Sequence, residues 1–113
     1  MATGVSGLPT DEIVALFASD GVIEMPGADP VEGAEALRAA YQGWAPRKPQ
    51  LHLVANTVIT SWSRNEATAA SDVAFLQQGE SGWAVRLVGR YGDTLHRHDG
   101  RWRFRRRITT FRP

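Results

Sequence analysis

A histidine near the middle of the chain is the first candidate for proton transfer. His52 lies in residues 51–61, a run rich in Val, Ile and Thr that predicts a β-strand. An ordinary imidazole has a pKa of about 6.5, which suits an acid or a base near neutral pH. A two-residue turn at Arg64–Asn65 would pair this strand with residues 67–77 and would place His52 on an apolar face that could line a pocket. That face also carries Val54, Val58, Val73 and Phe75. The same position equally suits a hydrogen-bonded histidine without a catalytic role.

Asp72 is the second candidate, because it is the only acidic residue in the small and apolar run 69–75. In the register set by that turn, it lies on the face opposite His52 and close to Thr57. A slip of one residue would bring it beside Asn56 and onto the face of His52. The carboxylate and the imidazole could then act together in proton transfer. Without the slip, Asp72 is a polar residue on the outer face or at a dimer contact.

The third candidate belongs to a long β-hairpin predicted for residues 83–111. Asp99-Gly100 closes it, because Asp-Gly favours a two-residue turn with positive φ at both positions. Setting His98 opposite Arg101 fixes the pairs that follow on one face. These are Arg97–Trp102, Leu95–Phe104, Asp93–Arg106 and Tyr91–Ile108. The other face is cationic, with His96, His98, Arg101, Arg103, Arg105 and Arg107.

In this register, Tyr91 and Asp93 lie on the apolar face of the hairpin. The Tyr91 hydroxyl could donate a hydrogen bond to a substrate carbonyl or enolate, or it could lie in the core with a protein partner. Asp93 lies opposite Arg106, and a paired carboxylate keeps a low pKa and is a poor base. We therefore interpret Asp93 and Arg106 as a structural ion pair.

The cationic face of the hairpin suggests two other functions, and we expect neither. His96 and His98 are two residues apart, but the sequence offers no third metal ligand near them, so we expect no metal site. The arginines of residues 101–107 alternate with apolar residues and form a solvated face. We therefore do not expect nucleic-acid binding.

The elements that must position these residues follow from local patterns. Thr10 is a suitable N-cap for a short helix whose apolar stripe is Ile13, Leu16 and Phe17. A short strand is predicted at residues 22–25, and a second helix begins at Asp29-Pro30. Its buried side is Val31, Ala34, Leu37, Ala40 and Tyr41, and it ends near Gly43. Four long antiparallel strands follow. The sequence predicts an α+β domain over residues 10–113, with helices on the concave face of a curved antiparallel sheet, after a flexible segment of residues 1–9.

Composition excludes several classes of function. The chain has 113 residues, a net charge of +1 and no cysteine, so it has neither a disulfide nor a thiol nucleophile. No apolar run approaches the ~18 residues that a membrane span needs. The N-terminal residues show no basic segment followed by an apolar run. We expect a single cytoplasmic domain.

Four stretches in this order resemble the nuclear-transport-factor-2-like superfamily, in particular its SnoaL-like branch. They are residues 16–27 (LFASDGVIEMPG), 51–56 (LHLVAN), 89–93 (GRYGD) and 99–107 (DGRWRFRRR). The resemblance implies a cone of curved sheet, often dimeric through the sheet, whose helices close a pocket for a small, mostly apolar molecule. Its members include polyketide cyclases, ketosteroid isomerases, dehydratases, epoxide hydrolases and proteins that only bind, so the fold leaves the chemistry open.

The resemblance also implies roles for individual residues. His52 matches the strand histidine that dehydratase-like relatives use as a general acid or base. Relatives usually begin with a long helix that contributes a Tyr and an Asp to the pocket. Here only about ten small residues precede Asp11, so the cone is expected to be open there or covered by a partner subunit. The ligand-binding residues that we expect are Phe17, Tyr41, Val54, Asn56, Phe75 and Trp102.

Two hypotheses follow for the function. In the first, the protein is an enzyme that cyclises, isomerises or dehydrates a polyketide-like or steroid-like metabolite by proton transfer, without a cofactor. His52 would be the acid or base, and Asp72 and Tyr91 would assist it. In the second, it is a non-catalytic ligand-binding or dimerisation module of the same fold. In both, we expect a small hydrophobic metabolite as ligand and a homodimer packed through the sheet, because an apolar sheet face favours association.

Overall fold

The long C-terminal hairpin forms as predicted and supplies the centre of the sheet. In the computed structural model, which describes residues 9–45 and 47–112, β5 (Gly82–His98) and β6 (Arg101–Phe111) are joined by Asp99 and Gly100. The φ angles of these two residues are 51° and 74°, as the predicted turn requires. The pairs His98–Arg101, Arg97–Trp102 and Leu95–Phe104 are the predicted ones.

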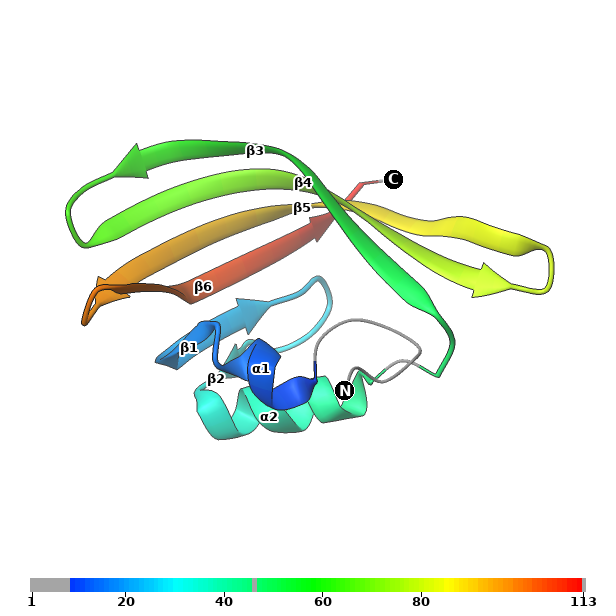
Figure 1. Cartoon of the computed structure of the whole chain (residues 1–113), viewed down its shortest axis with the longest axis horizontal. Coiled ribbons are helices and arrows are strands. Elements are labelled where there is room, and N and C mark those ends of the chain that lie inside the picture. Colours follow the sequence, from blue (N-terminus) through cyan, green and yellow to red (C-terminus); the bar gives the residue numbers. More distant parts are fainter. Residues whose placement is uncertain (1–8, 46, 113) are drawn as a thin grey trace.

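The sheet has six strands in the order β2-β1-β6-β5-β4-β3. The remaining strands are β1 (Phe17–Glu24), β2 (Val31–Glu32), β3 (Gln50–Trp62) and β4 (Glu66–Gly79). Neighbouring strands are antiparallel except for β1 and β6, which are parallel. The sheet curves over two helices that lie on its concave side (Figure 1). The predicted α+β class and the four long strands are confirmed, and the parallel pair is an addition.

Both helices are shorter than the sequence patterns predicted. α1 (Thr10–Val14) contains Thr10 as its first residue instead of as a side-chain cap, and α2 (Ala34–Gly43) begins after Gly33. Phe17 and Val31, predicted to be helical, lie in β1 and β2. Strand pairing explains the difference for Phe17, because its backbone pairs with that of Phe104 in β6 and its side chain is buried there.

The hydrophobic core joins the helices to β1 and β6. Leu37 of α2 is completely buried, and Val14, Phe17 and Ile23 pack with it. The Phe17 ring lies 5.4 Å from that of Phe104 and 6.3 Å from that of Tyr41, measured between centroids. These contacts hold α2 beneath one end of the sheet.

A β-bulge in the hairpin changes which arginine faces inward. Leu95 pairs with Phe104, but Thr94 pairs with Arg106, so Arg105 is an extra residue on β6. Beyond the bulge, Asp93 pairs with Arg107 and Tyr91 with Thr109. The predicted pairs Asp93–Arg106 and Tyr91–Ile108 are therefore wrong. Arg107 leaves the predicted cationic face and joins the concave side.

Two further irregularities separate β3 from a simple register with β4. The turn forms as predicted, with the Ser63 amide donating to the Glu66 carbonyl over 2.7 Å. Shifts then occur between Ile59 and Ser61 and between Ala55 and Val58. Two one-residue shifts restore the original alternation of faces. His52, now opposite Phe75, therefore keeps its predicted face.

Two other expectations concern the ends of the chain and membranes. Of the segment predicted to be flexible, residues 1–8 lie outside the described residues. Among the helices that the structure describes, none is long and apolar enough to cross a membrane.

Candidate functional site

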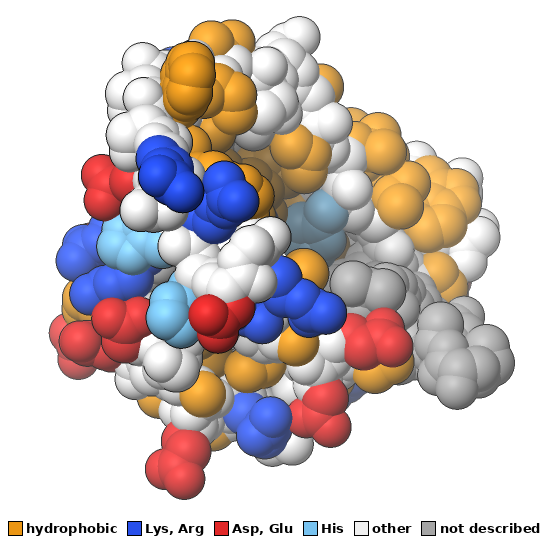
Figure 2. All heavy atoms as spheres, turned by 60° about the vertical axis from the view of Figure 1, so that its left-hand side comes forward, with side chains coloured by type: hydrophobic (Ala, Val, Ile, Leu, Met, Phe, Trp, Pro, Cys, Tyr) orange, Lys and Arg blue, Asp and Glu red, His pale blue; other side chains and the backbone are white. Residues whose placement is uncertain are grey.

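A cavity of about 670 Å³ lies between the helices and the concave side of the sheet. Both helices and strands β1, β3, β4, β5 and β6 contribute to its largely apolar wall. Figure 2 shows hydrophobic side chains gathered on the upper and right-hand part of one face, with the charged side chains mainly over its left, middle and lower parts. Five of the predicted site residues line the cavity: Tyr41, His52, Val54, Phe75 and Tyr91.

His52 reaches the cavity from β3, the strand at the edge of the sheet. Its ring lies 5.0 Å from that of Phe75 on β4, between centroids, at an interplanar angle of 34°. Burial, and secondly the positive charge of Arg107, lower the pKa of His52 below its ordinary value of 6.5. The imidazole is therefore neutral at pH 7 and able to accept a proton.

Two tyrosines line the same cavity and remain protonated at neutral pH. Burial raises the pKa of Tyr41 to about 12, against the opposing effect of Arg107. Burial also raises the pKa of Tyr91, where Arg107 opposes and Asp93 adds to the effect. Both phenolic hydroxyls are consequently available as hydrogen-bond donors to a ligand oxygen.

Arg107 is the charged cavity residue that the sequence analysis did not predict. Its Nε and Nη2 atoms donate to the two carboxylate oxygens of Asp93, over 2.8 and 2.9 Å. The guanidinium carbon lies 3.8 Å from the centroid of the Tyr91 ring and 4.4 Å from that of Phe104. Burial disfavours the charge, but the hydrogen bonds and the charge of Asp93 raise the pKa of Arg107 overall. Within a run of arginines, no local signal shows that the bulge falls at Arg105.

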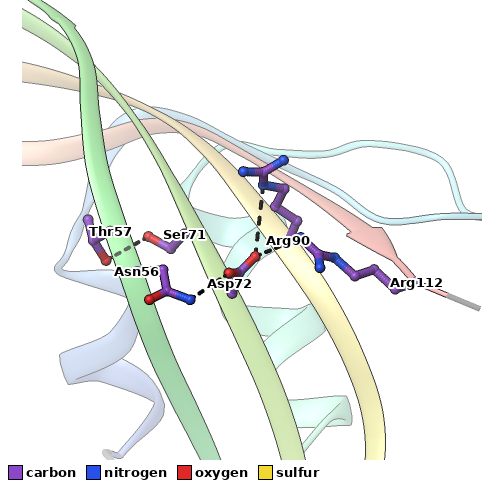
Figure 3. Close-up of polar contacts among 6 residues, drawn as sticks. All are labelled: Asn56, Thr57, Ser71, Asp72, Arg90 and Arg112. Atoms are coloured by element: carbon purple, nitrogen blue, oxygen red, sulfur yellow. Dashed lines mark hydrogen bonds and ion pairs between the residues drawn. The ribbon is translucent and has the colours of Figure 1, made fainter.

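Asp72 and Asn56 lie on the opposite face of the sheet from His52. Asp72 accepts a hydrogen bond from Asn56 Nδ2 over 2.9 Å and one from Arg112 Nη2 over 2.8 Å, and Arg90 Nε lies 4.0 Å away (Figure 3). The Asn56 hydrogen bond and the two arginines hold the pKa of Asp72 below its usual value. The predicted one-residue slip therefore does bring Asp72 to Asn56, but both residues point away from the cavity. The Asp72–His52 pair does not form.

The backbone explains how Asn56 reached that face. Its φ is 56°, a left-handed conformation within the β3 bulge. Next to it, the hydroxyls of Thr57 and Ser71 form a hydrogen bond of 2.9 Å (Figure 3). Sequence alternation alone would have placed Asn56 on the face of His52.

Two further predicted ligand residues do not line the cavity. Phe17 is 6% exposed and belongs to the core behind it. Trp102 is 44% exposed and lies outside the cavity lining. A pattern of alternating residues identifies a face, but it cannot distinguish core from cavity or from the end of a hairpin.

The histidines near the hairpin turn have carboxylate partners instead of a metal-ligand set. His96 Nε2 lies 2.9 Å from Glu66 Oε2, and His98 Nε2 lies 3.4 Å from Asp99 Oδ2. Across residues 9–45 and 47–112, no group of three His, Asp or Glu side chains is arranged to hold a metal ion.

Comparison with known proteins identifies the family. Residues 2–108 match the model of the SnoaL-like domain. The chain belongs to the SnoaL-like domain family. The predicted SnoaL-like, nuclear-transport-factor-2-like membership is thus confirmed. No curated protein matches this chain.

Solved structures with the same fold include proteins from several bacteria. A protein of unknown function from Mycobacterium tuberculosis is 24% identical, with a TM-score of 0.84 over 91% of this SnoaL-like chain. A candidate scytalone dehydratase from Novosphingobium aromaticivorans is 26% identical, with a TM-score of 0.79 over 92% of this chain and 71% of that one. A Catenulispora acidiphila protein in complex with S-DNPA is 24% identical, with a TM-score of 0.80 over 90% of this chain and 78% of that one. The chain spans 60% of the length of the M. tuberculosis protein.

Proposed function

We propose that this protein binds a small, mostly apolar, carbonyl-bearing cyclic metabolite and catalyses proton transfer on it without a cofactor. The observation that carries the proposal is a neutral imidazole, His52, in the same apolar cavity as the protonated hydroxyls of Tyr41 and Tyr91. Enolisation requires a base and hydrogen-bond donors around one carbonyl group. Here the base lies on β3 and the two donors lie on α2 and β5.

The chemistry would begin at a carbon next to the ligand carbonyl. His52 removes a proton from that carbon, the electron pair moves into the carbonyl, and the oxygen becomes an enolate. Tyr91 and Tyr41 donate hydrogen bonds to this oxygen. The protonated His52 then returns its proton elsewhere on the ligand or to a leaving hydroxyl. Isomerisation, cyclisation and dehydration can all start from this step.

The alternative function is binding without catalysis, and one observation favours it. No Asp or Glu lines the cavity among the described residues, because Asp72 lies on the other face and Asp93 is held by Arg107. His52 would then act without a carboxylate to orient it. The resemblance to a candidate scytalone dehydratase supports the enzyme, whereas the M. tuberculosis relative of unknown function favours neither alternative.

Hydrogen–deuterium exchange on a model ketone separates these alternatives. We would follow the α-protons of 2-tetralone in deuterated buffer by NMR, with the wild-type protein, His52→Gln and the control His98→Gln. His98 is exposed at the hairpin turn and does not line the cavity. If the protein is an enzyme, we expect the wild type and His98→Gln to accelerate the exchange and His52→Gln not to accelerate it. Ligand-induced shifts of the His52 resonances with no acceleration would favour the binding protein.

We further propose that the protein is a homodimer that packs through the convex face of its sheet. Leu51, Leu53, Val88 and Ile108 each lie between two residues that line the cavity, so their side chains point to the opposite face. They are between 39% and 50% exposed. These apolar side chains lie on three strands of the face that also carries Asp72 and its arginine partners, and they form a surface that a second copy would cover.

A further inference from the structure

The wall of the cavity has an asymmetric distribution of charge. Arg107 is the only Asp, Glu, Lys or Arg residue among the described residues that line it. Its partner Asp93 is 6% exposed and does not line the cavity, so the carboxylate lies behind the guanidinium. A ligand in the cavity would therefore meet the cation and not the anion.

Arg107 also has hydrogen-bonding capacity beyond its contact with Asp93. A guanidinium carries about five N–H donors, and the Asp93 carboxylate accepts from Nε and Nη2, one hydrogen bond each. Tyr91 and Phe104 lie within 4.4 Å of its carbon and hold its plane in place. A donor that is already oriented loses little conformational entropy when a ligand binds.

From this geometry we propose that Arg107 recognises an anionic oxygen on the ligand, either a carboxylate or the enolate formed during the reaction, with Asp93 as its positioning residue. The ligands that we expect are therefore apolar ring compounds that carry one carboxylate or one enolisable carbonyl group. This inference rests on the proposed function, since it assigns a specificity-determining residue to the same cavity.

The influence of this charge extends across the cavity. The positive charge of Arg107 acts to lower the pKa values of His52, Tyr41 and Tyr91. Asp93, which is paired with Arg107, acts in the opposite direction at Tyr91. The charge of Arg107 therefore acts on groups of three other elements that line the cavity, α2, β3 and β5.

Three naphthalene probes of similar shape test the charge preference. We would measure the binding of 1-naphthoate, 1-naphthamide and 1-naphthylmethylammonium by calorimetry at pH 7.5, where His52 is neutral and Arg107 supplies the charge. We expect 1-naphthoate to bind at least about tenfold more tightly than the neutral amide, as charge-assisted hydrogen bonds imply. The ammonium probe should bind more weakly than the amide.

Variants then assign the preference to Arg107. Arg107→Lys keeps the charge but not the paired donors, and the double variant Arg107→Met/Asp93→Asn removes both charges and avoids a buried unpaired carboxylate. We expect the double variant to bind 1-naphthoate and 1-naphthamide equally. The control Arg101→Met removes one positive charge at the hairpin turn, away from the cavity, and should keep the full preference.

The possible failures are distinguishable. If 1-naphthamide binds but 1-naphthoate gains nothing over it, the recognition of an anionic oxygen is wrong and the proposed apolar site stands. If the double variant still prefers 1-naphthoate to 1-naphthamide, another group causes that preference, and the role proposed for Arg107 is wrong. If no probe binds, the ligand-binding function and this inference both fail.

Discussion

Asp93 holds both Nε and Nη2 of Arg107 across β5 and β6, and only 5% of the Asp93 side chain contacts solvent. The arginine side chain is 22% exposed, and Arg107 lines the cavity. The ion pair therefore has its buried carboxylate within the sheet and its guanidinium in the wall of the cavity. Removing either partner leaves a charge in an environment that hydrates it poorly.

The first prediction concerns the stability that depends on this pair. Asp93→Ala should lower the free energy of unfolding by about 3–5 kcal/mol, because it leaves Arg107 without its carboxylate. The control is Asp20→Ala, which removes an ion pair between Arg105 Nε and Asp20 Oδ2, 3.1 Å apart, in which the Asp20 side chain is 66% exposed. That change should cost about 1 kcal/mol or less. Urea unfolding of both variants provides the measurement, and equal effects would contradict the structural role of Asp93.

The second prediction concerns the pH dependence that His52 confers. Its pKa is lowered in the folded protein, so the unfolded chain binds more protons between the folded pKa and 6.5. The contribution of His52 to stability is therefore fully present above pH 6.5 and is lost as the pH falls through the folded pKa. His52→Gln should lose less stability than wild type between pH 7.5 and pH 5.

A direct titration checks the same property. NMR should place the pKa of His52 below 6.5. An apolar ketone in the cavity should change the pKa of His52 again, because the ring lines that cavity. A His52 pKa at or above 6.5 would contradict the desolvation of this ring in the cavity.

These residues also show how far the sequence predicts the site. The predicted turns at Arg64–Asn65 and Asp99–Gly100, with the alternation of side chains, correctly placed His52 and Tyr91 on the faces that line the cavity, because local rules govern turns and faces. The bulges at Arg105 and near Asn56 have no comparable local signal, since tertiary packing decides where an extra residue is accommodated. Arg107 was therefore assigned to the wrong face, and Asn56 was expected in the pocket.

The third prediction concerns the stability effect of a substitution at Gly89, which lines the cavity. A Cβ atom there would lie 2.6 Å from the carbonyl oxygen of Thr110, which is backbone and cannot rotate away. Gly89→Ala should therefore push β5 and β6 apart and cost about 1–3 kcal/mol. Gly92 lies on the same strand, and a Cβ there would meet nothing within 4 Å. Gly92→Ala should change stability by less than about 0.5 kcal/mol, and thermal melts of the two variants compare them directly.

The last prediction tests the convex face of the sheet. Leu53 and Val88 are 50% and 42% exposed there, so placing a charge at each should prevent a second copy from packing on this face. We expect the wild-type protein to have twice the mass of one chain in light scattering at micromolar concentration, and Leu53→Arg/Val88→Arg to have the mass of one. The control Trp44→Arg changes a side chain that is 45% exposed but follows α2 and lines the cavity, on the other side of the sheet. It should remain dimeric, because its added charge stays in water in either state. A wild-type monomer would show that the convex face tolerates exposure to solvent, and the proposed dimer would then be wrong.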